Sequence, residues 1–444
     1  MIHIPEQEPL RTLILGAGGR DFHNFLQYFK NNPKFKVLGF TADQIPGIEK
    51  RKFPKELASP QYKHDIPIFL EKELPEVIKN LKIDYAFLCY SDLSHHEVGD
   101  KASIVLANGA NFALLGPKAT QLKSKLPVIS VCAVRTGCGK SRITRKIAMY
   151  LKRKGHHVVV IRHPMPYGDL KKQEVQKFYT YEDLNKANCT LEEREEYEHH
   201  IRSNIPVFAG VNYEKIMHEA EKEADVILWD GGNNDFPFIK PDLHIVLVDP
   251  RRPGHGLSYY PGEVNLRTAD IVIVNHMYGV LPEQIKEVEK NTRLVNKKAR
   301  LIEVKSLVIV KEPALIKGKR VLIVGDGPTL THGGMPTGVG TAAAVKYHAR
   351  KIIDPRPYAV GSIKETFKKF PHLQNAIPAM GYSKKQLKEL EQSINRTPCD
   401  IIIDATPGDI SRLIKIKKKM VYTSYDMDEH DMLPIFREIE KIVR

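Results

Sequence analysis

The chain has 444 residues, of which 42% are hydrophobic and 27% are charged, a composition typical of soluble globular proteins. This length predicts two or three domains, no run approaches the ~18–20 apolar residues of a membrane helix, and the N-terminus lacks the basic and apolar segments of a signal peptide. Lys and Arg exceed Asp and Glu by 15 (68 against 53), which favours a phosphorylated partner, whereas the even spread of charge argues against nucleic acid. We therefore expect a cytoplasmic protein with no membrane or nucleic-acid partner, in which five scattered cysteines are reduced thiols.

Short apolar runs alternate with helical patterns along the whole chain. Alternation of this kind, with strands that are almost continuously apolar, predicts an α/β protein with mostly parallel sheets. The predicted strands cover residues 12–16, 37–41, 85–89, 128–134, 157–162, 226–230, 245–248, 271–275, 321–324 and 401–403. The clearest helical patterns cover residues 142–154, 214–223 and 384–395.

These elements divide into three expected domains. Residues 1–125 predict a Rossmann-like α/β domain. Residues 126–310 carry a phosphate-binding loop and predict a central P-loop NTPase domain with a mostly parallel sheet. Residues 311–444 begin again with Lys-Gly-Lys-Arg-Val-Leu-Ile-Val-Gly-Asp-Gly and predict a small α/β C-terminal domain.

A glycine-rich turn, Gly16-Ala-Gly-Gly-Arg20-Asp21, follows the first predicted strand and opens a helical pattern. It is similar to a dinucleotide-binding turn, and Arg20 could contact a substrate phosphate. The fingerprint lacks its later glycine, because Asp21 stands in that place. We therefore expect a second anion site or a simple tight turn here rather than a redox cofactor site.

The strongest motif is the phosphate loop Arg135-Thr136-Gly137-Cys138-Gly139-Lys140-Ser141, which lies between a predicted strand and a predicted helix. The glycines let backbone N–H groups point at a phosphate chain, and the helix N-terminus adds its dipole. Lys140 would reach the β- and γ-phosphates, and the Ser141 hydroxyl would bind Mg²⁺. The loop lacks the usual leading glycine, whose place Val134 takes. Arg135 could act as a second catalytic cation that reaches a phosphate across a dimer.

A phosphate loop needs an acidic residue at the end of a neighbouring strand. Asp230 ends the apolar run Val226-Ile-Leu-Trp and is expected at the carboxyl edge of the sheet, where it would support the metal and catalysis; Asp235 could assist.

Another predicted strand ends in Asn275-His-Met-Tyr278, where GTPases carry Asn-Lys-x-Asp. Asn275 is therefore predicted to contact the nucleotide. The phenol of Tyr278 cannot accept two guanine N–H groups as a carboxylate does, which favours ATP with GTP as an alternative.

Two cationic groups follow strands of the same domain and could hold a substrate's phosphates. Arg162 and His163 follow the strand after the phosphate-loop helix, and Arg252 and His255 follow the strand at 245–248. The alternative for both is an exposed, solvated loop. The charged run at 192–200 is interpreted as a solvated helix face, with metal binding through Glu196 and a neighbouring histidine as the alternative.

Several long strings together resemble a known family. They include Cys132-Ala-Val-Arg-Thr-Gly-Cys-Gly-Lys-Ser141, Trp229-Asp-Gly-Gly-Asn-Asn-Asp-Phe-Pro237 and Asp354-Pro-Arg-Pro-Tyr-Ala-Val-Gly-Ser362, with further strings at 16–24, 162–169 and 249–255. Over almost its whole length the chain resembles predicted P-loop GTPases that are often named cyclic 2,3-diphosphoglycerate synthetases. The resemblance implies an ATP-dependent closure of 2,3-diphosphoglycerate to a cyclic anhydride, with release of ADP and phosphate.

Taken together, the sequence predicts an ATP-dependent ligase or phosphoryl-transfer enzyme that uses Mg²⁺. Its partner would be a phosphorylated small molecule, with 2,3-diphosphoglycerate as the implied substrate, and we expect a homo-oligomer, as a dimer. The alternative is a P-loop NTPase that delivers a metal or cofactor or acts as a switch. A non-catalytic nucleotide sensor is a further alternative.

Overall fold

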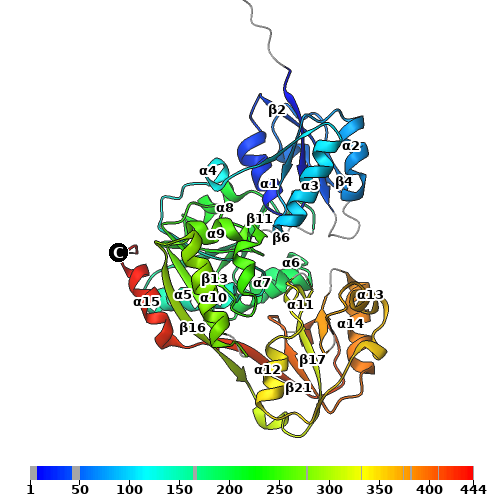
Figure 1. The fold of residues 1–444 in the computed structure, drawn as a ribbon, viewed down its shortest axis with the longest axis vertical. Coiled ribbons are helices and arrows are strands. Elements are labelled where there is room, and N and C mark those ends of the chain that lie inside the picture. Colours follow the sequence, from blue (N-terminus) through cyan, green and yellow to red (C-terminus); the bar gives the residue numbers. More distant parts are fainter. Residues whose placement is uncertain are drawn as a thin grey trace, which may run out of the picture.

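The computed structural model describes residues 8–42, 51–163, 168–276, 279–331, 333–373, 375–380, 383–408 and 410–443. The N-terminal part contains a six-stranded sheet in the order β3-β4-β2-β1-β5-β7. Its strands are β1 (Leu10–Leu15), β2 (Phe35–Ala42), β3 (Lys52–Phe53), β4 (Ile66–Leu70), β5 (Tyr85–Leu88) and β7 (Asn111–Leu114). Its helices are α1 (Arg20–Asn24), α2 (Leu74–Asn80) and α3 (His95–Ala107), and α4 (Pro117–Thr120) follows (Figure 1). All pairs except β3–β4 are parallel, as the apolar runs predict.

The central part forms one half of a second, larger sheet, in the order β10-β11-β9-β12-β8-β13-β15-β16. Its strands are β8 (Val128–Ala133), β9 (Val158–Arg162), β10 (Val175–Phe178), β11 (Val207–Gly210), β12 (Val226–Asp230), β13 (Leu243–Val248), β15 (Ile271–His276) and β16 (Arg300–Val310). Its helices are α5 (Lys140–Arg153), α6 (Tyr181–Lys186), α7 (Leu191–Ile201), α8 (Tyr213–Ala220), α9 (Gly262–Thr268) and α10 (Pro282–Val295). The short strands β6 (Leu93–Ser94) and β14 (Tyr259–Tyr260) pair with each other and join this part to the N-terminal part.

The C-terminal part continues the same sheet, because β16 pairs antiparallel with β21 (Met420–Met427) through residues 306–310 and 423–427. The order then runs β21-β20-β17-β18, and β19 also pairs with β17. The further strands are β17 (Arg320–Asp326), β18 (Lys351–Ile352), β19 (Ile377–Ala379) and β20 (Ile401–Ala405). The helices are α11 (Gly327–Leu330), α12 (Val339–Lys346), α13 (Gly361–Lys369), α14 (Lys384–Arg396) and α15 (Glu429–Glu440).

The last helix, α15, returns to the central part, as the red helix in Figure 1 shows. Its buried residues Met432, Ile435, Phe436 and Ile439 belong to the hydrophobic core built around β8 and α5. The Phe436 ring stacks on Tyr150 of α5 with 3.9 Å between centroids. After β21 the chain therefore leaves the C-terminal part, and its last helix belongs to the hydrophobic core of the central part.

The α/β fold class with mostly parallel sheets is confirmed, and every predicted strand and helical pattern overlaps an observed one. The predicted boundary at 125 falls between the two sheets. The predicted boundary at 310 falls on the last residue of β16, whose two halves pair with β15 and with β21. Among the described residues, no helix is long and apolar enough to cross a membrane.

Candidate active site

The phosphate loop connects β8 to α5 and is held open by glycine and asparagine. Gly137 and Gly139 have φ of +83° and +100°, the left-handed region that a side chain disfavours. A Cβ on Gly139 would also lie 2.8 Å from Asn275 Nδ2. That amide donates to the Cys138 carbonyl at 2.7 Å, while its Oδ1 accepts from Ser306 Oγ at 2.7 Å. Asn275, predicted to contact the nucleotide, is thus placed as a support for the loop backbone.

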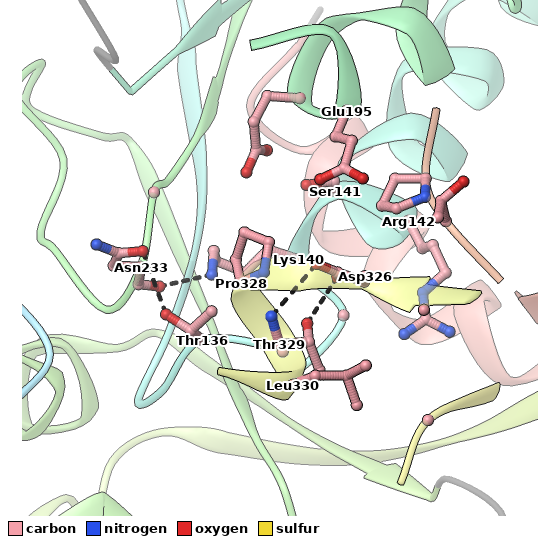
Figure 2. Close-up of a pocket in the computed structure, with 18 of the residues that line it drawn as sticks. Thr136, Lys140, Ser141, Arg142, Glu195, Asn233, Asp326, Pro328, Thr329 and Leu330 are labelled. Carbon is pink, nitrogen blue, oxygen red and sulfur yellow. Dashed lines mark hydrogen bonds between the residues drawn. The ribbon is translucent and has the colours of Figure 1, made fainter. Parts of the chain in front are cut away.

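The loop opens into a cavity of about 370 Å³ that is lined by all three parts of the chain. Thr136, Gly137, Gly139, Lys140 and Ser141 line it from the central part. The Lys140 ammonium donates to the Asn233 carbonyl at 2.5 Å, as Figure 2 shows. The Asp326–Leu330 segment closes against the loop, because a Cβ on Gly137 would lie 2.9 Å from Thr329 Cγ2. A ligand on the phosphate loop would therefore also contact the C-terminal part.

Arg142 is a cavity residue that the sequence reasoning missed. It stands two positions after Lys140, and its guanidinium lies 4.8 Å from the centroid of the Tyr425 ring. Among the described residues its Nη1 has no hydrogen-bond partner, and burial lowers the pKa of Arg142 to about 10. A half-buried cation with an unused, buried donor atom beside a phosphate loop fits an anionic ligand. Its position on the first turn of α5 is the sequence signal that could have found it.

Asp230 ends β12 as predicted but does not line the cavity. Its Oδ1 lies 3.2 Å from Thr144 Oγ1 and its Oδ2 lies 3.0 Å from His200 Nε2. Although burial alone would raise the pKa of Asp230, Arg162 and His200 hold it well below its usual range. The carboxylate therefore supports α5 through Thr144, one turn after Lys140. Ligand atoms of Asp230, His199 and His200 lie within 4.8 Å of one another, a set that could hold a metal ion.

Arg162, His163 and Arg20 line the cavity but are paired within the protein. Arg162 forms an ion pair with Glu196, and its Nη1 donates to the Asp230 carbonyl at 2.7 Å. His163 Nε2 lies 3.2 Å from Asp235 Oδ2, and Arg20 Nη1 lies 3.0 Å from Asp235 Oδ1. Asp235 thus ties the N-terminal turn to the central part from the wall of the cavity.

The cavity-lining residues do not include Arg135, Arg252 or His255. The Arg135 guanidinium pairs with Asp92 at 2.8 Å and stacks on Tyr259 at 3.6 Å from the ring centroid. Arg252 donates to the carbonyls of Thr136 at 2.8 Å and Gly333 at 2.7 Å.

The His255 ring packs at a tilt against Tyr259 with 4.6 Å between ring centroids, and burial lowers the pKa of His255 to about 4. Arg252 therefore holds the backbone of the loop and of the C-terminal part, whereas Arg135 and His255 pack with Asp92 and Tyr259.

The N-terminal turn carries its own anion. Asp21 Oδ1 accepts from the backbone N–H groups of Gly18, Gly19 and Phe22 at 2.9, 3.0 and 2.7 Å. These are the donors that a phosphate would otherwise use. Of the two interpretations left open by the sequence, this geometry is that of a tight turn, although residues 17–21 still line the cavity.

Helix α7 is almost entirely buried, so the interpretation of residues 192–200 as a solvated helix face is wrong. The helix lies between the central and C-terminal parts, where His200 meets Asp230 and Leu191 joins the C-terminal core. Glu195, Glu196 and His199 of this helix line the cavity. Tertiary contacts have overridden the polar character of the segment.

Two further positions fall outside the described residues. Tyr278, on which the choice of ATP over GTP depended, lies there, and so do residues 164–167 of the loop after Arg162. Asp326, by contrast, is a described cavity residue that the sequence reasoning missed. Its place at the carboxyl end of the parallel strand β17 is a signal by which the sequence could have identified it.

Comparison with known proteins gives two curated relatives. The chain is 56% identical over 424 residues to arginine synthetase ArcE from Thermococcus kodakarensis, covering 96% of this chain and 95% of that protein. It is 28% identical over 112 residues to a cyclic 2,3-diphosphoglycerate synthetase from Thermococcus sibiricus, covering 24% of this chain and 25% of that protein. No family model matches the chain.

Solved structures give only distant likenesses. LpxK from Aquifex aeolicus in complex with ATP has a TM-score of 0.42 and 14% identity, covering 73% of this chain and 90% of that chain. The hydrogenase maturation factor HypB from Archaeoglobus fulgidus has a TM-score of 0.27 and 14% identity, covering 40% of this chain and 81% of that chain. At these TM-scores the likenesses carry no argument about activity.

Proposed function

The chain belongs to the family of the arginine synthetase ArcE, an ATP-dependent ligase family, and from this membership we propose that it forms arginine. The observation that carries the proposal is the 56% identity over nearly the whole of both chains. The geometry supports it, because the phosphate loop opens into a cavity that both flanking parts complete. A small substrate bound there would lie next to the terminal phosphate of a nucleotide.

The chemistry of arginine limits what the precursor can be. A phosphate loop serves transfer of a γ-phosphoryl group, and phosphorylation of an oxygen atom on the precursor turns that oxygen into a leaving group that an incoming nitrogen can displace. The guanidino carbon of arginine is bonded only to nitrogen, so the precursor must carry an oxygen in place of one nitrogen. We therefore take the ureido compound citrulline as the precursor. Its ureido oxygen would attack the γ-phosphorus and release ADP, and ammonia would then displace phosphate to leave the guanidinium group.

The residues of the cavity divide this work. The backbone N–H groups of residues 137–140 and the N-terminus of α5 would hold the phosphate chain. Lys140 and Arg142 would neutralise the charge that moves onto the transferred group, so that catalysis comes from positioning and charge rather than from a protein nucleophile.

The hydroxyl of Ser141 fits Mg²⁺, because it lines the cavity beside Lys140 and offers the oxygen ligand that this ion prefers. The ion would supply neutralisation of phosphate charge. Asp230, which is buried under Thr144, would support the same helix from below. ATP as the nucleotide, a cytoplasmic location and a homodimer stay predictions.

Closure of 2,3-diphosphoglycerate to a cyclic anhydride is the second candidate. It is supported by the 112-residue match to a cyclic 2,3-diphosphoglycerate synthetase and by the strings in the sequence that resemble that family. That match covers 24% of this chain, against 96% for the arginine synthetase. The arginine-forming reaction is therefore the better supported of the two.

The deciding experiment supplies L-arginine, ADP, phosphate and Mg²⁺ to the purified protein and measures ATP, since a ligase also catalyses the reverse of its own reaction. We expect ATP only when all components are present, and arginine with ADP when citrulline, ammonium and Mg-ATP are supplied instead. A parallel reaction with 2,3-diphosphoglycerate and Mg-ATP is followed by ³¹P NMR. A cyclic phosphate signal there, without arginine chemistry, would refute the proposal in favour of the second candidate.

A further inference from the structure

We infer that Glu195 and Asp326 form a subsite for the cationic nitrogen group of the reaction, namely ammonium on entry and the guanidinium of arginine at the end. This inference rests on the proposed function and goes further, because it assigns the group that recognises the nitrogen. Both residues line the cavity that the phosphate loop opens into, Glu195 from α7 and Asp326 from the end of β17 (Figure 2).

The first observation is that a carboxyl oxygen of Glu195 is buried without a hydrogen-bond donor from the described residues. Its side chain is 4% exposed, and among the described residues no donor lies within hydrogen-bonding distance of its Oε1. A buried carboxyl oxygen without a donor is costly, because burial removes the water that would otherwise solvate it. A ligand with N–H donors in the cavity would offset that cost.

The second observation is the charge of the surroundings. Burial, followed by the neighbouring carboxylates Asp326, Glu192 and Glu196, raises the pKa of Glu195 well above its usual value. Burial likewise raises the pKa of Asp326, although hydrogen bonds from the Thr329 N–H and hydroxyl and the charge of Arg142 oppose the rise. Carboxyl groups that repel one another in a buried wall favour a cation between them.

Position fits these carboxyl groups to the reaction. Lys140, Ser141 and Arg142 line the same cavity, so a cationic nitrogen held by Glu195 lies in the compartment where phosphate leaves. Figure 2 draws Glu195 and Ser141 among the residues that line this cavity, and Asp326 beside Thr329, whose hydroxyl donates to it at 2.6 Å. A planar guanidinium carries donors that match carboxylate oxygens in pairs, which suits two acidic residues better than a neutral ureido group does.

The test compares L-arginine with its neutral isostere L-citrulline in binding to the wild type and to Glu195→Gln, by titration calorimetry in the presence of Mg²⁺ and ADP. Loss of the charged partner is expected to weaken arginine binding about tenfold or more and citrulline binding less than about threefold. In turnover with citrulline and Mg-ATP, the KM for ammonium should rise more than kcat falls. Glu198→Gln is the matched control, because Glu198 lies on the same helix, is buried, and pairs with Arg194 at 3.1 Å outside the cavity lining.

The possible outcomes distinguish failure of the proposed function from failure of the subsite inference. If the wild type binds neither arginine nor citrulline, the proposed function fails. If the wild type binds arginine and Glu195→Gln binds it equally well, the subsite inference fails while the function stands. If Glu195→Gln loses Mg-ADP affinity but keeps its preference for arginine, Glu195 serves the metal and the inference is overturned.

A second variant keeps the inference testable if Glu195→Gln does not fold. Asp326→Asn can still accept from the Thr329 N–H, so the start of α11 is retained while the charge is lost. We expect the same selective loss of arginine affinity. Unchanged arginine binding in this variant would refute the role of Asp326.

Discussion

Two glycine-rich turns of this chain look alike in sequence and differ in what fills them. Both follow a parallel strand and precede a helix, at residues 16–21 and 135–141. In the first, which we call the closed turn, the Asp21 carboxylate accepts from three backbone N–H groups. In the second, which we call the open turn, no side chain of the described residues accepts from the N–H groups of residues 137–140, and the turn opens into the cavity. A turn of this kind predicts an anion site only when the sequence does not supply the anion itself.

The largest expected effect comes from the open turn. Lys140→Ala should lower ATP-dependent turnover by at least about 100-fold, because the ammonium beside the transferred phosphate is lost. Arginine formation from citrulline, ammonium and Mg-ATP measures this loss. Lys152→Ala, an exposed lysine on the same helix, is the control and should retain activity. Full turnover in Lys140→Ala would mean that the open turn is not the nucleotide site.

Support of the open turn should matter next. Asn275→Ala removes the donor to the Cys138 carbonyl and leaves the hydroxyl of Ser306 with only the weaker acceptor Met427 Sδ at 3.4 Å. We expect the affinity for Mg-ADP to fall about tenfold, the cost of one buried hydrogen-bond network at the loop. Titration calorimetry with ADP and Mg²⁺ checks it. Unchanged affinity would show that the loop keeps its shape without Asn275.

Arginine binding in the cavity beside the open turn should depend on pH, with an effect no larger than that of Asn275→Ala. Because the pKa of Glu195 is raised, the free protein takes up a proton there at a higher pH than an ordinary glutamate does, and a bound cation would displace that proton. Arginine binding should therefore tighten as the pH rises through that raised pKa, by up to about tenfold per pH unit below it. Calorimetry at several pH values measures the slope, and Glu195→Gln should flatten it. A slope that persists in the variant would assign the proton to another group.

The closed turn should give the smallest effect on nucleotide binding. Asp21→Ala leaves the N–H groups of Gly18, Gly19 and Phe22 without their acceptor and should cost about 1–3 kcal/mol of folding free energy. The midpoint of thermal unfolding should fall, while Mg-ATP affinity changes less than about threefold. If nucleotide affinity instead falls as far as it does in Asn275→Ala, the two turns are not distinct in function.

Secondary structure was predicted best for strands whose own sequence is almost continuously apolar and ends in a clear turn. The buried strands β8, β9 and β12 are almost continuously apolar, so their positions followed from composition. The strand β16 was missed although its residues alternate between exposed and buried, because its turn signals are weak and its two halves pair with different partners.

The site was predicted only in part, because its other half comes from long-range packing. The phosphate loop is contiguous in sequence, so its residues could be identified together. Glu195 lies on a helix that looks solvated, and only its burial against the C-terminal part reveals an unpartnered carboxyl oxygen. Arg162 and Arg20 carry the charge that a phosphate site needs, yet Glu196 and Asp235 already take it. Which charges stay free for a ligand depends on contacts between distant segments.

The return of α15 to the core around α5 also bears on how the protein is made. The ribosome releases residues 128–310 long before residues 429–440, yet Met432, Ile435 and Phe436 fill the same core as β8 and α5. The central part of the nascent chain therefore keeps an apolar surface uncovered until the C-terminal strands have been synthesised and β21 has paired with β16. Completion of the phosphate-loop domain is thereby tied to the emergence of the last helix.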